Sequence, residues 1–214
     1  MNYLEQAQEF ILNNTKKEYY KSAYKKAELL YWELIYQWFV DNDIKIESCL
    51  DIGCAYGTWL SIVKHKYCNT SLYGIDFRDD IISHDIIKKL DLDFKVCNIQ
   101  IESMPFTNKF DLIILTEVLE HFNFNCISTI DKMVESMNDG GYLFFSTPNY
   151  YKQPKIQTYK SYKEMPSIGS KYEDKHIYIF KPEEVEEIFV KIMNLKPILF
   201  ETNKFGHING IFQK

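Results

Sequence analysis

Hydrophobic residues recur along the chain in two different rhythms, and the rhythm changes near residue 48. In the first part they follow helical spacing, as in the stripe of Leu4, Ala7 and Ile11 and in a second stripe over residues 27–38. No glycine or proline interrupts this first part. The pattern predicts two amphipathic helices that form a helical cap over residues 1–47.

From residue 48 onward, short apolar runs alternate with amphipathic segments, which is typical of a parallel sheet with helices on both faces. The predicted strands span residues 48–52, 71–76, 93–98, 109–115 and 141–147, and two last strands at 197–202 and about 207–212 pair antiparallel. The predicted helices span about 57–66, 79–90, 122–138 and 181–193. We therefore expect an α/β, Rossmann-like, doubly wound domain over residues 48–214, with a mostly parallel seven-stranded sheet.

Two features of the later part depart from this alternation. Gly140-Gly141 is predicted to end the helix that precedes the strand at 141–147. Residues 148–176 are rich in Pro, Lys and Tyr and lack periodicity. So long a loop is uncommon inside a compact domain, so we expect it to be either functional, as a loop that contacts the substrate, or partly disordered.

The amino-acid composition excludes several classes of protein. With 46% hydrophobic and 26% charged residues the chain is globular, and its net charge of −5 disfavours the nucleic-acid backbone as main partner. The five cysteines are odd in number and lack a C-x-x-C pair, which favours a reducing compartment over disulfides or structural zinc. No signal peptide and no apolar run of ~20 residues is visible, so we expect a cytoplasmic protein without a membrane span.

The first predicted strand is followed by a turn and a helix in an arrangement that suits a nucleotide. Gly53 lets the backbone approach a ligand closely, and Gly57 permits tight packing where the helix begins. Asp76 ends the next strand, where its carboxylate can accept hydrogen bonds from ribose hydroxyls. These residues fit a nicotinamide-dependent dehydrogenase as well as other nucleotide-binding enzymes.

The wider sequence distinguishes these possibilities. The segment Leu50–Gly57 resembles the first motif of class I S-adenosylmethionine-dependent methyltransferases, and position 55 is alanine where a dinucleotide enzyme needs G-x-G-x-x-G. The blocks at 96–99, 109–114, 117–121 and 140–149 follow in the order of that family, with a weaker echo at 176–185. The resemblance covers about residues 48–149 and implies S-adenosylmethionine as the cofactor.

The resemblance also assigns roles to single residues. It implies that Asp51 and the backbone of Gly53 and Ala55 hold the methionine part of the cofactor, and that Asp76 binds the ribose. Asn98 stands where the family usually has Asp facing the adenine amino group, and an amide oxygen can accept the same hydrogen bond. The complete set of implied cofactor-binding residues is Asp51, Gly53, Ala55, Gly57, Asp76, Phe77, Asn98, Ile99 and Thr116.

The segment after the fourth strand supplies the candidate chemistry. Glu117, Glu120 and His121 would share one face of a helical turn, where they could hold a divalent metal. This segment is similar to the metal-binding segment of ubiquinone-biosynthesis O-methyltransferases, and it also resembles small-RNA 2′-O-methyltransferases, which add a later histidine that His176 would supply. In the alternative without metal, Glu117 caps the helix, Glu120 is solvated and His121 alone faces the substrate as general base. The catalytic candidates are thus His121, Glu117 and His176.

Aromatic residues supply the candidate substrate contacts. Tyr20 and Tyr24 lie in the helical cap and would belong to a lid, and Tyr150 begins the long loop. For each of them, packing in the interior is the alternative interpretation. The remaining histidines, His65, His84 and His207, have no partner pattern and are interpreted as surface residues.

Taken together, the sequence predicts a methyltransferase that acts on an oxygen or nitrogen of a small polar acceptor. Surface-polysaccharide and phosphorylated or nucleotide-linked precursors are the preferred acceptors, and lysines of the long loop would suit an anionic group. The alternatives are a small-RNA 2′-O-methyltransferase-like enzyme, a catalytically silent binding module, and a nicotinamide-dependent oxidoreductase. The sequence leaves the oligomeric state open.

Overall fold

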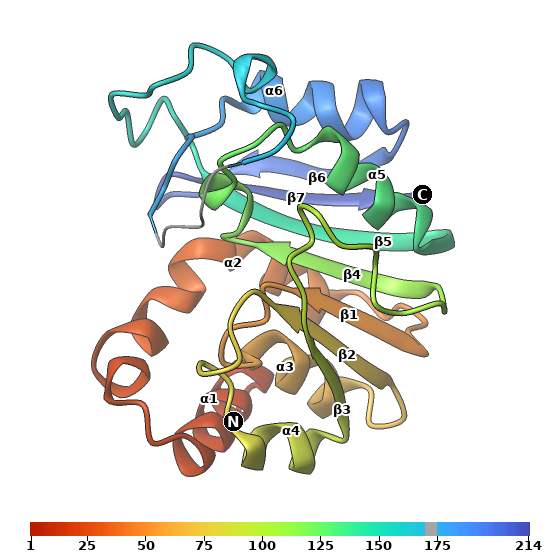
Figure 1. The fold of residues 1–214 in the computed structure, drawn as a ribbon. Helices are drawn as coiled ribbons and strands as arrows, with labels where there is room; N and C mark the ends of the chain where they lie inside the picture. The colour runs from red at the N-terminus through yellow and green to blue at the C-terminus, as the bar shows by residue number, and fades with distance from the viewer. Residues whose placement is uncertain (170–174) are drawn as a thin grey trace.

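A seven-stranded sheet forms the centre of the molecule (Figure 1). The computed structural model describes residues 1–169 and 175–214, so residues 170–174 of the predicted loop lie outside the described residues. The strands are β1 (Ser48–Ile52), β2 (Ser71–Asp76), β3 (Leu92–Val96), β4 (Phe110–Thr116), β5 (Met137–Pro148), β6 (Lys196–Thr202) and β7 (His207–Gln213). Their order is β3-β2-β1-β4-β5-β7-β6, with β7 antiparallel to both neighbours. The predicted doubly wound, mostly parallel sheet is confirmed.

Helices cover both faces of the sheet, as Figure 1 shows. One face carries α1 (Tyr3–Asn14), α2 (Lys25–Asp41), α3 (Thr58–Lys66) and α4 (His84–Leu90), with the π-helical turn η1 (Tyr20–Tyr24) before α2. The other face carries α5 (Ile127–Glu135) and α6 (Pro182–Glu186), which continues into η4 (Glu187–Ile192). The short turns η2 (Leu119–His121) and η3 (Tyr162–Glu164) belong to connecting segments. In the described part of the chain, no helix combines the length and apolar character that crossing a membrane requires.

The first 47 residues share a hydrophobic core with the sheet. The ring of Trp32 on α2 lies 4.6 Å from that of Trp59 on α3, and Phe39 and Trp59 both contact Phe144 of β5. Aromatic side chains of this size bury enough apolar area to hold α2 and α3 against the sheet. The predicted division of the chain at residue 47 stays a prediction.

The α2 helix is kinked in the middle, at Trp32, whose backbone angles (φ −133°, ψ 33°) are not helical. A kink frees backbone carbonyl groups that need new partners. The side-chain amide of Asn203 donates to the carbonyl oxygen of Leu30 (2.7 Å), and that of Asn209 donates to the carbonyl oxygen of Tyr31 (2.8 Å). The β6–β7 hairpin therefore stabilises the kink and fixes the part of α2 that carries Tyr31.

Several predicted boundaries are wrong for local reasons. The helix predicted at 79–90 begins only at His84, because the Ser83 side chain caps it by accepting from the Ile86 amide (3.2 Å). The helix predicted at 122–138 is shorter, since α5 begins at Ile127 and the preceding turn η2 is separate. Gly140-Gly141 does not end a helix but lies inside β5, where the pairing with β4 shifts register.

Candidate functional site

A cleft of about 1180 Å³ opens at the carboxyl ends of the central strands, where the strand order reverses between β1 and β4. Open α/β sheets bind ligands at this point, and the volume exceeds that of a pocket for one small ligand. Most of the residues predicted from the sequence line it, namely Tyr24, Gly53, Ala55, Asp76, Phe77, Asn98, Ile99, Thr116, Glu117, Glu120, His121 and His176. Asp51, Gly57, Tyr20 and Tyr150 are not among the residues that line the cleft.

The turn after β1 forms one wall of this cleft. Gly53 has φ +73°, and a Cβ atom there would stand 2.4 Å from Cγ2 of Val118. Both facts require glycine at this position. The backbone amide of Ala55 donates to Oδ2 of Asp76 (3.0 Å), while the amide of Arg78 donates to Oδ1 (3.0 Å). Asp76 therefore holds together the ends of β1 and β2 as well as facing the cleft.

Two of the predicted substrate contacts lie away from the cleft. Tyr20 is completely buried and donates a hydrogen bond to Glu28 (3.3 Å). Tyr150 lies at a second groove, where Nζ of Lys181 stands 5.6 Å from its ring. Tyr24 does line the cleft, packed against the ring of Tyr56 at 4.9 Å. Of the three tyrosines predicted to contact the substrate, only Tyr24 lines the cleft, where it can contact a ligand.

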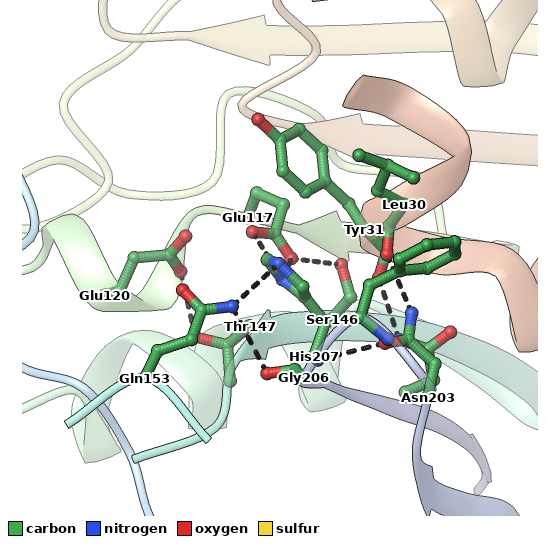
Figure 2. A network of polar contacts seen from close by, with 12 residues as sticks. Leu30, Tyr31, Glu117, Glu120, Ser146, Thr147, Gln153, Asn203, Gly206 and His207 are labelled. Carbon is green, nitrogen blue, oxygen red and sulfur yellow. Dashed lines mark hydrogen bonds and ion pairs between the residues drawn. The ribbon is translucent and has the colours of Figure 1, made fainter. Parts of the chain in front are cut away.

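Glu117 follows β4 directly and has an unusual backbone. Its φ is +56°, a left-handed conformation that non-glycine residues rarely adopt, and its side chain is only 13% exposed. Its carboxylate accepts from Oγ of Ser146 (2.8 Å) and lies 3.1 Å from Nδ1 of His207 (Figure 2). Burial raises the pKa of Glu117 to about 8. Glu117 does not cap η2, in contrast to the alternative drawn from the sequence.

His207 corrects an interpretation made from the sequence, because it is buried and not a surface residue. It begins β7 and pairs with Pro148 at the end of β5. Since β7 is antiparallel, its first residue lies at the carboxyl edge of the parallel strands, where the cleft is. The predicted direction of this strand was the signal that could have found His207. Burial lowers the pKa of its imidazole.

A second group of polar side chains lies beside this pair. Glu120, His121 and His176 each offer a ligand atom, and these atoms all lie within 4.8 Å of one another. Glu120 is buried and not solvated, which corrects the alternative drawn from the sequence, and its Oε2 accepts from Oγ1 of Thr147 (3.0 Å). Its other oxygen, Oε1, has no hydrogen-bond partner among the described residues.

This group fits a divalent cation, because it joins a carboxylate oxygen that lacks a hydrogen bond with two imidazoles. Its members differ from the predicted metal ligands Glu117, Glu120 and His121. Glu117 is not part of the group and pairs with His207 instead, and His176 of the long loop takes its place. Burial and the nearby Glu117 charge raise the pKa of Glu120 well above its ordinary value, an effect that a bound cation would oppose.

Comparison with known proteins decides the family. A model of a family described as a methyltransferase domain matches residues 7–196. The chain belongs to the class I S-adenosylmethionine-dependent methyltransferases. The predicted cofactor is therefore the one that this family uses.

Individual relatives of this methyltransferase are distant. The mitochondrial ubiquinone biosynthesis O-methyltransferase of Candida albicans is 29% identical over 115 residues, which are 50% of this chain and 34% of that protein. The matches cover between 34% and 48% of the curated relatives' own lengths.

Solved structures share the fold. A S-adenosylmethionine-dependent methyltransferase from Clostridium acetobutylicum superposes with a TM-score of 0.65 at 14% identity, over 92% of this chain and 99% of that one. The N-methyltransferase NodS from Bradyrhizobium japonicum WM9, in complex with S-adenosylhomocysteine, has a TM-score of 0.56 at 15% identity, over 100% of this chain and 99% of that one.

The described residues fit this cofactor. Asp51 is buried at the end of β1, and burial together with the nearby Asp76 charge raises its pKa to about 8. Asp51 does not itself line the cleft, but it precedes the lining residues Ile52 and Gly53, and a positive charge nearby, such as the amino group of the cofactor, would favour its ionised form. Phe77 is 43% exposed at the edge of the cleft, and the buried Ile99 lies among the lining residues with it. Both side chains could therefore contact a flat ring.

Proposed function

We propose that this chain transfers the methyl group of S-adenosylmethionine to an oxygen or nitrogen of a small polar acceptor. One observation carries the proposal. A single cleft is lined both by most of the predicted cofactor residues and by a set of acidic and imidazole side chains suited to proton transfer. The volume of about 1180 Å³ leaves room for an acceptor beside the cofactor.

Calorimetry tests the cofactor part of this proposal. We expect S-adenosylhomocysteine to bind and NAD not to bind. We also expect the affinity to rise as the pH increases from 6 to 8.5, since burial holds the pKa of Asp51 near 8 and the ligand's ammonium group requires the ionised carboxylate. Asp51→Asn should bind weakly and show a flatter pH dependence. Tight binding of NAD, or no binding of S-adenosylhomocysteine, would overturn the proposed function.

The class of acceptor is suggested by a second groove of about 520 Å³. It is lined by Lys155, Lys160 and Lys181, and none of its described lining residues is acidic. A hydrogen bond connects the walls of the groove and the cleft: Nζ of Lys155 in the groove donates to the carbonyl oxygen of His176 (3.2 Å), a residue that lines the cleft. These lysines support a phosphorylated or nucleotide-linked acceptor whose anionic group would lie in the groove.

Measurement of S-adenosylhomocysteine formation over a panel of acceptors tests this class. We expect sugar phosphates and nucleotide-linked sugars to react faster than the corresponding neutral sugars. Lys160→Ala should raise the KM for an anionic acceptor about tenfold, which is the effect expected for the loss of one charge-assisted contact. The affinity for the cofactor should stay unchanged. Lys163→Ala is the matched control, since Lys163 is exposed and paired with Glu187 at 2.6 Å. A preference for neutral acceptors would contradict an anionic substrate.

A metal is the second proposal for this site, carried by the group of Glu120, His121 and His176. We expect Mn²⁺ or Zn²⁺ to bind one site per chain, and His176→Ala to weaken binding by about tenfold or more, since an imidazole ligand is lost. His84→Ala is the control, because His84 is exposed at the start of α4. Titration calorimetry on the protein without acceptor measures both. Equal affinities in the two variants would exclude this group as the site.

A further inference from the structure

We propose that His207, oriented by Glu117, is the base that takes the proton from the acceptor during methyl transfer. The proposal rests on the proposed function and adds a residue that the sequence did not suggest. Both side chains line the cleft, and both come from the carboxyl edge of the sheet. Figure 2 shows them facing each other next to Ser146.

The hydrogen bonds around the imidazole determine which nitrogen carries the proton. Nδ1 of His207 lies 3.1 Å from the Glu117 carboxylate. Above pH 8, where Glu117 is mostly ionised, this carboxylate can only accept, so Nδ1 carries the hydrogen. The lone pair is then on Nε2, which lies 3.1 Å from the side-chain nitrogen of Gln153. Gln153 lines the cleft and is exposed, so an acceptor hydroxyl can replace its amide as donor to Nε2.

The surroundings hold this pair in one arrangement. The ring of Tyr31 lies 5.1 Å from the imidazole, and Tyr31 is fixed there by the kink in α2 that Asn203 and Asn209 stabilise. Asn203 also accepts from the backbone amide of His207 (3.0 Å). Glu117 keeps its left-handed backbone, a strained conformation that is often stored where function requires it. A buried carboxylate that orients an imidazole is an arrangement known to support proton transfer.

The chemical step balances with these groups. A bond forms between the acceptor oxygen and the methyl carbon while the bond between that carbon and sulfur breaks, and its electron pair neutralises the sulfonium. The proton of the acceptor hydroxyl passes to Nε2 of His207, and the Glu117 carboxylate stabilises the resulting imidazolium. Among the described titratable groups, Glu120 of η2 acts on the imidazole through its charge, and Tyr31 of α2 and Tyr24 of η1 lie close enough for the Glu117 charge to act on them.

The first experiment needs no acceptor. Nitrogen-15 NMR of the histidine side chains, recorded on the chain saturated with S-adenosylhomocysteine at pH 8.5, reports the tautomer of His207, assigned with His207→Gln. We expect hydrogen on Nδ1 and a lone pair on Nε2 in the wild type, and loss of this preference in Glu117→Ala, which removes the acceptor. Hydrogen on Nε2 in the wild type would overturn the inference and leave the proposed function intact, whereas failure to bind S-adenosylhomocysteine would overturn the proposed function itself.

The second experiment uses the anionic sugar that reacts fastest in the acceptor panel. His207→Ala should lower kcat by about 10²–10⁴-fold, the usual contribution of a general base, with little change in cofactor affinity. Added imidazole should restore part of that rate, which a merely structural role would not allow. His84→Ala, at an exposed position, should keep the wild-type rate. An unchanged kcat in His207→Ala, or a loss that imidazole does not rescue while cofactor binding persists, would count against His207 as the base.

Discussion

Replacement of Asp76 by alanine is expected to weaken the binding of S-adenosylhomocysteine by about 100-fold or more. The carboxylate has two tasks in this structure. It accepts backbone hydrogen bonds from Ala55 and Arg78, and it faces the cleft, where its remaining lone pairs can accept from the ribose hydroxyls. Each hydrogen bond to a charged group contributes about 1.5–3 kcal/mol, so the loss of two such bonds accounts for the expected change.

Titration calorimetry at pH 8.5 measures this effect, and thermal unfolding of the same samples shows whether the variant is folded. Asp76→Asn should fall between the wild type and Asp76→Ala, because an amide retains one acceptor oxygen. Asp93→Asn is the matched control, since Asp93 lies on the adjacent strand β3 and is paired with Lys95 at the surface. A cofactor affinity in Asp76→Ala within a few-fold of that of the control would show that Asp76 does not hold the ribose.

The sheet could be predicted from the sequence because its strands are short and nearly continuous apolar runs, such as Leu112–Leu115, whose side chains are all fully buried. Such a signal is local and needs no knowledge of the rest of the chain. The boundaries of α4 and α5 were less predictable, because they depend on single side-chain contacts: Ser83 caps α4, and Asn125 accepts from the amide of Ile127 where α5 begins. The turn residues Gly53 and Gly57 were predicted from their position between a strand and a helix, and the structure adds that both have a left-handed backbone, which favours glycine.

The chemical site was harder to predict because its partners are far apart in sequence. Glu117 was expected to share a helical face with Glu120 and His121, but it precedes η2 in a left-handed conformation, so helical spacing does not apply to it. Its partner His207 lies 90 residues further along the chain. Only the antiparallel direction of β7 brings the two together, and this consequence follows from the topology and not from a motif.

The position of the Tyr20 side chain also depends on partners that are distant in the sequence. Tyr20 and Tyr24 were both expected to contact the substrate, yet only Tyr24 lines the cleft. Tyr20 is drawn inward because Glu28 of α2 is buried and accepts its hydroxyl hydrogen bond. Glu28 also accepts hydrogen bonds from Gln8 (2.9 Å) and from the hydroxyl of Thr58, so four elements meet at one carboxyl group.

Glu28→Gln is expected to stabilise the fold increasingly as the pH rises. Burial raises the pKa of Glu28 from 4.5 to about 7, so the fold favours the protonated form of Glu28 over its ionised form. A folded-state pKa above the unfolded value contributes stability that is complete below about 4.5 and is lost as the pH rises through 7. The free energy of unfolding of the wild type should therefore fall by about 3 kcal/mol between pH 4.5 and 8, whereas that of the variant should not show this loss.

The glutamine can preserve the hydrogen bonds, since its oxygen can accept from Gln8 and Tyr20 while its amide donates to Thr58. Urea unfolding at pH 5 and pH 8 measures the difference, with Glu9→Gln, at an exposed position of α1, as the matched control for the loss of one acidic group. We expect the two variants to differ little at pH 5, because Glu28 is then mostly protonated, and to separate at pH 8. A free energy of unfolding that changes equally with pH in both variants would show that Glu28 ionises without cost. In that case the protonated carboxyl group of Glu28 would not be what stabilises the contact between the N-terminal helices and the start of α3.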